Sequence, residues 1–297
     1  MQKIGLFLVL QLLTLSCAHR TKIAEHVFDS EAGKKKLEEA AYNVPIAEQT
    51  GPLSFAWVKN SVDWPIIELK IEGQRYFALI DSGSTLSAVR EDSPLLKLAS
   101  EKVSLPQGIG GFYRFDKINL APTASVKNVY FLAYTKAVHE PKFNDFPCCD
   151  MILGQDFFQA FDVTFKKNSF IAFSKVGEAN PAPDNSNFKI EKFERKSLIW
   201  TTSVKIDKKV CDKARVDTAG SNDVLAIFGP WYGKNRPDQV TLDFAGRNIQ
   251  VKTRFSDEFT GYVGKGICAN LGRGQLFDTE KSLTLSLTRG LGFYHSP

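Results

Sequence analysis

Two aspartates stand at matching places in the two halves of the chain. Each follows a short stretch that ends in apolar residues, each precedes a hydroxyl residue, and a glycine comes within three positions. Glycine permits a tight turn in which backbone N–H groups can bond a carboxylate. The two stretches are Phe77-Ala78-Leu79-Ile80-Asp81-Ser82-Gly83-Ser84 and Ala214-Arg215-Val216-Asp217-Thr218-Ala219-Gly220-Ser221.

These two turns, if they meet, would place Asp81 and Asp217 on either side of one water molecule. Two carboxylates about 3 Å apart cannot both be ionised, so they share a proton, and one acts as a base while the other acts as an acid. Such a pair can activate water to hydrolyse a peptide bond without a covalent intermediate.

The elements that carry these turns have the pattern of β-strands. Residues 65–71 alternate between apolar and polar side chains, Glu72-Gly73-Gln74 is typical of a turn, and residues 76–80 form a second apolar run. This pattern predicts a β-hairpin that leads into Asp81.

Four landmarks recur in the same order in both halves, which predicts a duplicated β domain. The second copy is shorter, and most of the difference falls in a segment of the first half that contains Gly108-Ile109-Gly110-Gly111-Phe112. The matched landmarks are the two Asp turns, residues 116–120 with 238–242, residues 127–129 with 247–249, and Leu153-Gly154 and Phe161-Asp162 with Leu271-Gly272 and Phe277-Asp278.

Three ordered motifs in residues 63–175 resemble those of the retropepsin-like aspartic proteases. The first is similar to their active-site strand and loop, the second to the flap tip of the immunodeficiency-virus protease, and the third to the strand, turn and helix that follow. In this chain they are Ala78-Leu79-Ile80-Asp81-Ser82-Gly83-Ser84, Gly108-Ile109-Gly110-Gly111-Phe112 and Ile152-Leu153-Gly154-Gln155-Asp156-Phe157.

The resemblance implies an all-β fold with two retropepsin- or pepsin-like β-barrel lobes, related by internal duplication, around a central cleft. It implies an aspartic endopeptidase in which Asp81 and Asp217 are catalytic and a flap at 108–112 closes over an extended polypeptide. Apolar substrate side chains would be favoured by Ile109 and Phe112. The residues expected to support the two active-site loops are Ser82, Gly83, Ser84, Thr218 and Gly220.

The second motif departs from the family pattern, because Ala219 stands where a turn glycine is expected and Gly220 comes one place later. A left-handed backbone at Ala219 would be costly. Either the loop absorbs the change as a bulge, or Asp217 is misplaced. The second outcome leaves two alternatives: an inactive, membrane-tethered peptide-binding protein, or an active homodimer that uses Asp81 from each chain.

Five segments are expected along the chain. Residues 1–17 form a signal peptide, and residues 18–60 form a tether or pro-segment with a helix at 30–42. Residues 61–176 form the first lobe with its flap, residues 177–194 form a linker rich in Pro, Asn and Ser, and residues 195–297 form the second, shorter lobe.

The first 17 residues read as an export signal, since a basic start precedes an apolar stretch that is too short to span a bilayer. The sequence around Cys17 resembles a bacterial lipoprotein cleavage site, which implies a lipidated N-terminus at a periplasmic membrane; plain cleavage and secretion is the alternative. An exported chain favours disulfides, and Cys211 with Cys268 is the preferred bridge because both flank the second Asp turn. Cys148 and Cys149 are left as free thiols, as a bridge to each other, or as partners of that pair.

Composition and charge exclude several classes of protein. The net charge of +5 is small for 297 residues, and the basic residues are scattered, so no nucleic-acid partner is expected. No metal-ligand spacing, nucleophile motif or phosphate loop is present. Together with the resemblance, these absences imply a hydrolase with no cofactor and no metal, which acts as a monomer on polypeptides and contacts the membrane only through a lipid at Cys17.

Overall fold

The computed structural model is described for residues 45–84, 86–104, 111–134, 149–179, 187–192, 199–221, 223–257 and 266–295. In this part of the chain the protein is all-β, with four short helical pieces: η1 (Pro94–Leu98), α4 (Gln155–Phe158), α5 (Gly229–Tyr232) and α6 (Arg273–Leu276). None of these helices could cross a bilayer. Several predicted features lie outside the described residues, namely the signal peptide with Cys17, the helix at 30–42, Gly108, Ile109, Gly110 and Cys148.

The first sheet has eight strands: β1 (Ile46–Gln49), β3 (Ile66–Ile71), β4 (Gln74–Ile80), β5 (Ala88–Arg90), β6 (Glu101–Ser104), β7 (Gly111–Ala121), β8 (Ala124–Tyr134) and β9 (Met151–Leu153). Its order is β3-β4-β9-β5-β8-β7-β6, with β1 beside β8. The pairs β4·β9 and β5·β8 are parallel, and the remaining pairs are antiparallel.

The hairpin that leads into Asp81 forms as predicted. In β3 the side chains of Ile67, Leu69 and Ile71 are buried, while the charged residues between them are exposed. The turn between β3 and β4 consists of Glu72 and Gly73, which both have positive φ (48° and 80°). Two such residues in a row give the turn that matches the right-handed twist of a two-residue hairpin.

The second sheet has seven strands: β13 (Glu191–Lys192), β14 (Trp200–Ile206), β15 (Lys209–Val216), β16 (Val224–Phe228), β17 (Gln239–Phe244), β18 (Arg247–Ser256) and β19 (Ala269–Leu271). From β14 onwards its order is β14-β15-β19-β16-β18-β17. The parallel pairs are β15·β19 and β16·β18. The first sheet has the same strand order and the same directions over β3-β4-β9-β5-β8-β7. In both sheets the strand that comes last in the chain, β9 or β19, lies third in this order.

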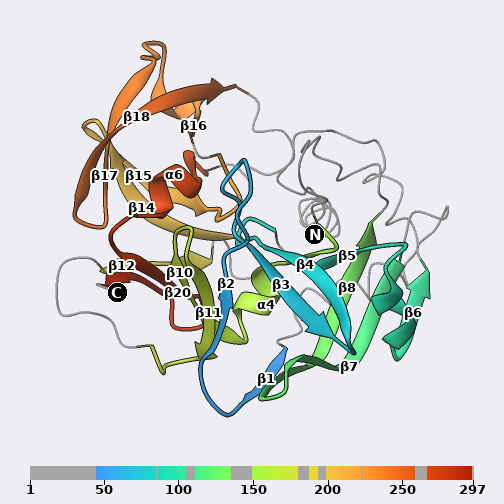
Figure 1. Cartoon of the computed structure of the whole chain (residues 1–297). Coiled ribbons are helices and arrows are strands. Elements are labelled where there is room, and N and C mark those ends of the chain that lie inside the picture. The colour runs from blue at the N-terminus through green and yellow to red at the C-terminus, as the bar shows by residue number, and fades with distance from the viewer. Residues whose placement is uncertain are drawn as a thin grey trace.

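The third sheet combines strands from both halves: β2 (Leu53–Ala56), β10 (Phe161–Lys166), β11 (Phe170–Lys175), β12 (Asn187–Lys189), β20 (Ser282–Ser286) and β21 (Leu291–His295). Its order is β12-β21-β20-β10-β11-β2. At its centre β10 pairs with β20, and the Oγ1 atoms of Thr164 and Thr284 lie 2.8 Å apart. Figure 1 shows β10 and β20 side by side, apart from the first sheet at the right and the second sheet at the upper left.

Two predicted segment boundaries differ from the structure. Strands β1 and β2 lie within the expected tether, and Trp57 after them is buried and packs edge-on against Phe277 at 5.4 Å. Strands β12 and β13 lie within the expected linker. In both places a short strand adds to a sheet edge, where β2 pairs with β11 and β12 with β21. The amino-acid composition of a short segment does not reveal that it pairs with the edge of a sheet, so these strands were assigned to the tether and the linker.

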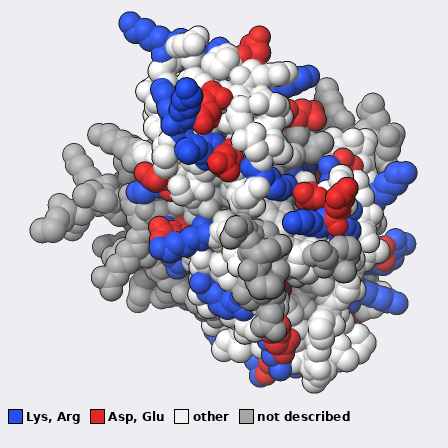
Figure 2. All heavy atoms as spheres, turned by 90° about the vertical axis from the view of Figure 1, so that its left-hand side faces the viewer, with Lys and Arg blue, Asp and Glu red and all other residues white. Residues whose placement is uncertain are grey.

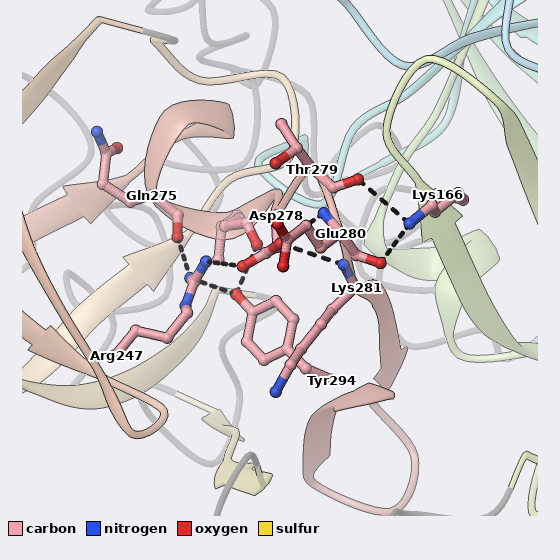
Figure 3. A network of polar contacts seen from close by, with 9 residues as sticks. Lys166, Arg247, Gln275, Asp278, Thr279, Glu280, Lys281 and Tyr294 are labelled. Atoms are coloured by element: carbon pink, nitrogen blue, oxygen red, sulfur yellow. Dashed lines mark hydrogen bonds and ion pairs between the residues drawn. The ribbon is translucent and has the colours of Figure 1, made fainter. Parts of the chain in front are cut away.

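The buried apolar residues form one large cluster that runs through both halves, from Trp57 to Tyr294. A polar network fastens the second sheet to this core. The Arg247 guanidinium lies 4.4 Å from the centre of the Tyr294 ring, donates to its hydroxyl at 2.6 Å, and pairs with Asp278 at 3.5 Å (Figure 3). Burial raises the pKa of Tyr294, so this hydroxyl stays protonated and donates to the carbonyl of Leu276 at 2.5 Å.

Positive and negative side chains are mixed on the surface. Figure 2 shows Lys and Arg interspersed with Asp and Glu over one face, with no continuous area of one sign. Many of them form exposed ion pairs, such as Arg75 with Glu68 and Lys127 with Glu48. Exposed pairs of this kind contribute little to stability.

Candidate active site

Two equivalent pairs of parallel strands position the two aspartates. Asp81 follows β4, which pairs with β9, and its N–H donates to the carbonyl of Leu153 at 3.0 Å. Asp217 follows β15, which pairs with β19, and its N–H donates to the carbonyl of Leu271 at 3.0 Å. Both carboxylates therefore project from the same point of the same local arrangement.

Reciprocal hydrogen bonds join the two loops. The Ser82 N–H donates to Oγ1 of Thr218 at 2.9 Å, and the Thr218 N–H donates to Oγ of Ser82 at 3.0 Å. The two hydroxyls then donate across the interface, from Thr218 to the carbonyl of Ile80 at 2.8 Å and from Ser82 to the carbonyl of Val216 at 3.1 Å. All four bonds are buried, so they hold the loops, which lie 136 residues apart in the chain, in one fixed relation.

The side chain of Asp217 lies directly against Gly83. A β-carbon added at Gly83 would come within 2.3 Å of Oδ1 of Asp217 and 2.4 Å of its Cγ. The φ of Gly83 is not positive, so the residue is not needed for a left-handed backbone. Glycine is needed here because the carboxylate of the opposite loop approaches so closely.

The change to Ala219 does not produce the predicted bulge. The Gly220 N–H donates to the Asp217 carbonyl at 3.0 Å, as the Ser84 N–H donates to the Asp81 carbonyl at 3.0 Å. The two turns are therefore in register, and Ala219 corresponds to Gly83. The backbone of Ala219 does not have a positive φ, so the expected cost of a left-handed alanine is wrong.

The two carboxyl groups sit in a buried and electrostatically coupled pair. Asp81 and Asp217 are each about 1% exposed. Burial and then the charge of Asp217 raise the pKa of Asp81 to about 7, although the Arg215 guanidinium and the N–H of Gly83, 2.8 Å from Oδ1, act in the opposite direction. Asp81 therefore keeps a proton at mildly acidic pH.

Four polar residues that sequence reasoning missed brace the loops. Arg215 donates to the carbonyl of Gly83, and Gln155 donates to the carbonyl of Ser82. Arg273 donates to the carbonyl of Ala219 at 2.7 Å, and Asn270 donates to Oδ2 of Asp217 at 3.0 Å. Burial lowers the pKa of Arg273 to about 10, so it remains cationic at neutral pH. The sequence offered one signal for these four residues, namely that each is a polar residue within or directly beside a motif of one of the two halves.

Asp156, which belongs to the third motif, lies in the first turn of α4 and is buried. Its Oδ1 accepts from the N–H and the hydroxyl of Ser87, both at 2.8 Å, and the Ser87 hydroxyl accepts from the N–H of Gly154 at 3.0 Å. Burial raises the pKa of Asp156 to about 6. This group ties the chain that leaves the Asp81 loop to the start of α4.

Of the flap predicted at 108–112, only Gly111 and Phe112 lie within the described residues. They begin β7, and Gly111 pairs with Ser104 of β6, so the hairpin base is formed. Phe112 is 2% exposed and pairs with Leu132 on β8. The expectation that Phe112 contacts substrate stays a prediction, because residues 105–110, which precede Gly111 and Phe112, lie outside the described part of the chain.

The structure joins Cys211 to Cys268, as predicted, with their Cα atoms 5.8 Å apart. The bridge connects β15 to the residue before β19, which are the two elements that position Asp217. Cys149 is also in a disulfide, and its partner lies outside the described part of the chain. The described residues contain no group of three His, Cys, Asp or Glu side chains that could hold a metal ion.

Comparison with known proteins gives no assignment, since no family model and no curated protein matches this chain.

Proposed function

We propose that the protein is an aspartic endopeptidase in which Asp81 and Asp217 activate one water molecule. The observation that carries this proposal is the meeting of the two Asp turns, in which the Asp217 carboxylate packs on Gly83 and the Ser82 and Thr218 hydroxyls bond across. Two buried carboxyl groups in contact, one with a pKa near 7, suit general acid and base catalysis.

The reaction needs only these two groups and water. The ionised carboxylate takes a proton from water as the water oxygen bonds to the scissile carbonyl carbon, and the protonated carboxyl gives its proton to the carbonyl oxygen. The resulting diol then collapses: the C–N bond breaks, the amine nitrogen takes a proton from the first carboxyl, and a diol hydroxyl returns one to the second. Both carboxyl groups end in their starting states.

The assignment of two retropepsin- or pepsin-like lobes is part of the same proposal. The first two sheets share one strand order, and their parallel pairs match. In each sheet the strand that comes last in the chain is followed by a turn and then by a four-residue helix. These features support two retropepsin- or pepsin-like lobes that arose by internal duplication. They also support a dyad within one chain, because Asp217 occupies the place that the Asp81 of a second copy would need.

The registered turn at Ala219 favours an active enzyme over an inactive peptide-binding protein. We propose extended polypeptides as substrates, with the segment at 108–112 as the flap. Export and lipidation at Cys17 stay predictions from the sequence, as does a monomeric state.

A peptide-library cleavage assay with the full chain, from pH 4 to pH 8, tests the proposal. Asp81→Asn and Asp217→Asn should each abolish cleavage, while Asp243→Asn, an exposed strand residue of the second sheet, should not. Activity that survives in Asp217→Asn would point to a homodimer through Asp81. A wild-type protein that binds peptides and cleaves none would favour the inactive binding protein.

A further inference from the structure

The two aspartates sit in matching turns but are held by different donors. Oδ1 of Asp81 accepts from the backbone N–H of Gly83 at 2.8 Å. Among the hydrogen bonds of the described residues, the equivalent N–H of Ala219 makes no such bond to Asp217. Instead Oδ2 of Asp217 accepts from Nδ2 of Asn270 at 3.0 Å. The second turn therefore depends on a side chain for a bond that the first turn makes with its backbone.

Asn270 is not required by the strand on which it lies. It is the central residue of β19, pairs with Arg215 on β15, and comes directly before Leu271. The matching residue of β9 is Ile152, directly before Leu153, which is buried and has no polar atom in its side chain. The fold thus accepts an apolar residue at this point, and the amide at 270 requires another explanation.

The amide of Asn270 favours the ionised form of the carboxylate that it bonds, since an N–H donor to a charged oxygen is stronger than one to a neutral acid. The other oxygen of Asp217, Oδ1, is buried and accepts from no N–H or hydroxyl group of the described residues. It is the oxygen nearest to the loop of Asp81. An oxygen in that state is available to a water or to the proton of the opposite carboxyl.

We infer that Asn270 is a positioning residue that holds Asp217 as the ionised member of the dyad, so that Asp217 takes the proton from the attacking water and Asp81 protonates the substrate carbonyl. This inference rests on the proposed function. It is consistent with the burial and charge that raise the pKa of Asp81. It also accounts for the different donors in the two turns, because the side chain of Asn270 bonds the carboxylate that the N–H of Ala219 does not.

Asn270→Leu tests the inference, because it removes the donor and leaves an apolar residue such as the first sheet already has. A hydrogen bond to a charged group contributes enough to lower kcat by about 10- to 100-fold when it is lost. KM should change less than about threefold, and the acidic limb of the kcat/KM profile should move to higher pH by about one unit. Asn248→Leu, at an exposed position of β18, is the matched control and should leave all three unchanged.

A second measurement does not depend on cleavage. In protein labelled with ¹³C at the aspartate carboxyl carbons, the resonance lost in Asp217→Asn should ionise at lower pH than the resonance lost in Asp81→Asn. In Asn270→Leu the gap should narrow or reverse. If the Leu variant does not fold, Asn270→Asp takes its place, because it keeps the shape but replaces the amide donor with a carboxyl. The gap between the two titrations should narrow or reverse in this variant as well.

The outcomes separate the two proposals. If the wild type cleaves peptides and Asn270→Leu keeps its kcat and pH profile within twofold, the role of Asn270 is overturned and the protease assignment stands. If the wild type cleaves nothing, the proposed function fails, and the carboxyl titration still decides the order of ionisation. An order in which Asp81 ionises first, or one that Asn270→Leu does not alter, overturns the inference.

Discussion

Replacement of Gly83 by alanine tests most directly whether the two loops meet as described. The new β-carbon would lie 2.3 Å from Oδ1 and 2.9 Å from Oδ2 of Asp217. An ordinary contact is about 3.4 Å, so the Asp217 carboxylate must retreat by about 1 Å. A displacement of that size at a reacting group costs about 100-fold in rate, and the overpacking should lower the free energy of unfolding by about 1–3 kcal/mol.

The assay for Gly83→Ala combines kcat on a cleaved peptide with urea unfolding. Gly51→Ala is the matched control, because a β-carbon there meets no atom within 4 Å and the φ of Gly51 is not positive. It should change neither quantity. Wild-type kcat and stability in Gly83→Ala would refute the reasoning, since the carboxylate would then have room that the structure does not give it.

Three further predictions concern stability and its dependence on pH. Because burial and Asp217 raise the pKa of Asp81 to about 7, above its value in the unfolded chain, this group contributes most stability below about pH 4, and the contribution is lost as pH rises through 7. Asp81→Asn should flatten that fall, by up to roughly 1.4 kcal/mol per pH unit, in urea titrations from pH 4 to 8. Thr218→Val should cost about 2–4 kcal/mol, because it leaves the Ser82 N–H and the Ile80 carbonyl without their bonds, whereas Thr279→Val at an exposed site should cost less than about 0.5 kcal/mol. Replacing both Cys211 and Cys268 by alanine should lower the free energy of unfolding by about 4 kcal/mol, as expected for a bridge that spans 57 residues, and equal stability with and without the bridge would contradict this.

Local signals in the sequence predicted the parts of the fold that local chemistry determines. Alternating side chains predicted the hairpin of β3 and β4, and the apolar stretches before Asp81 and Asp217 predicted the strands that carry them. The bridge between Cys211 and Cys268 followed from their places beside the second turn. The hairpin and the two strands depend on residues close together in the chain, whereas the bridge joins residues 57 positions apart.

The sequence matched the two halves only in part, because residues of the same type need not occupy equivalent positions in the two sheets. Asn128 is the fifth residue of β8 and has a positive φ, whereas Asn248 is the second residue of β18 and does not. Phe161 begins β10, but Phe277 is the residue directly after α6, five residues before β20 begins. The two halves correspond in their strand order and not in these individual residues.

The contacts that the sequence could not predict are those between distant segments. Gly83 was interpreted by its own backbone, yet the reason for it is a carboxylate from the other half. The roles of Arg215 and Asn270 depend on the pairing of β15 with β19, which brings them beside the dyad. Their types were visible in the sequence, but their neighbours were not.

The sheet shared by both halves also determines when the molecule can become complete during synthesis. Its central pair joins Thr164 to Thr284, which are 120 residues apart, so β10 has no partner on that side until the chain has been made as far as β20. Long-range pairings of this kind form late, because chain closure must be met before they stabilise anything.

The bonds between Ser82 and Thr218 join residues 136 positions apart, so the two carboxyl groups cannot come together before the chain has been made beyond residue 218. On the proposed function, the protein can hydrolyse peptides only after these two loops have met. On that proposal, a partly folded chain in which the loops are still apart would lack the dyad that could cleave its own unfolded segments.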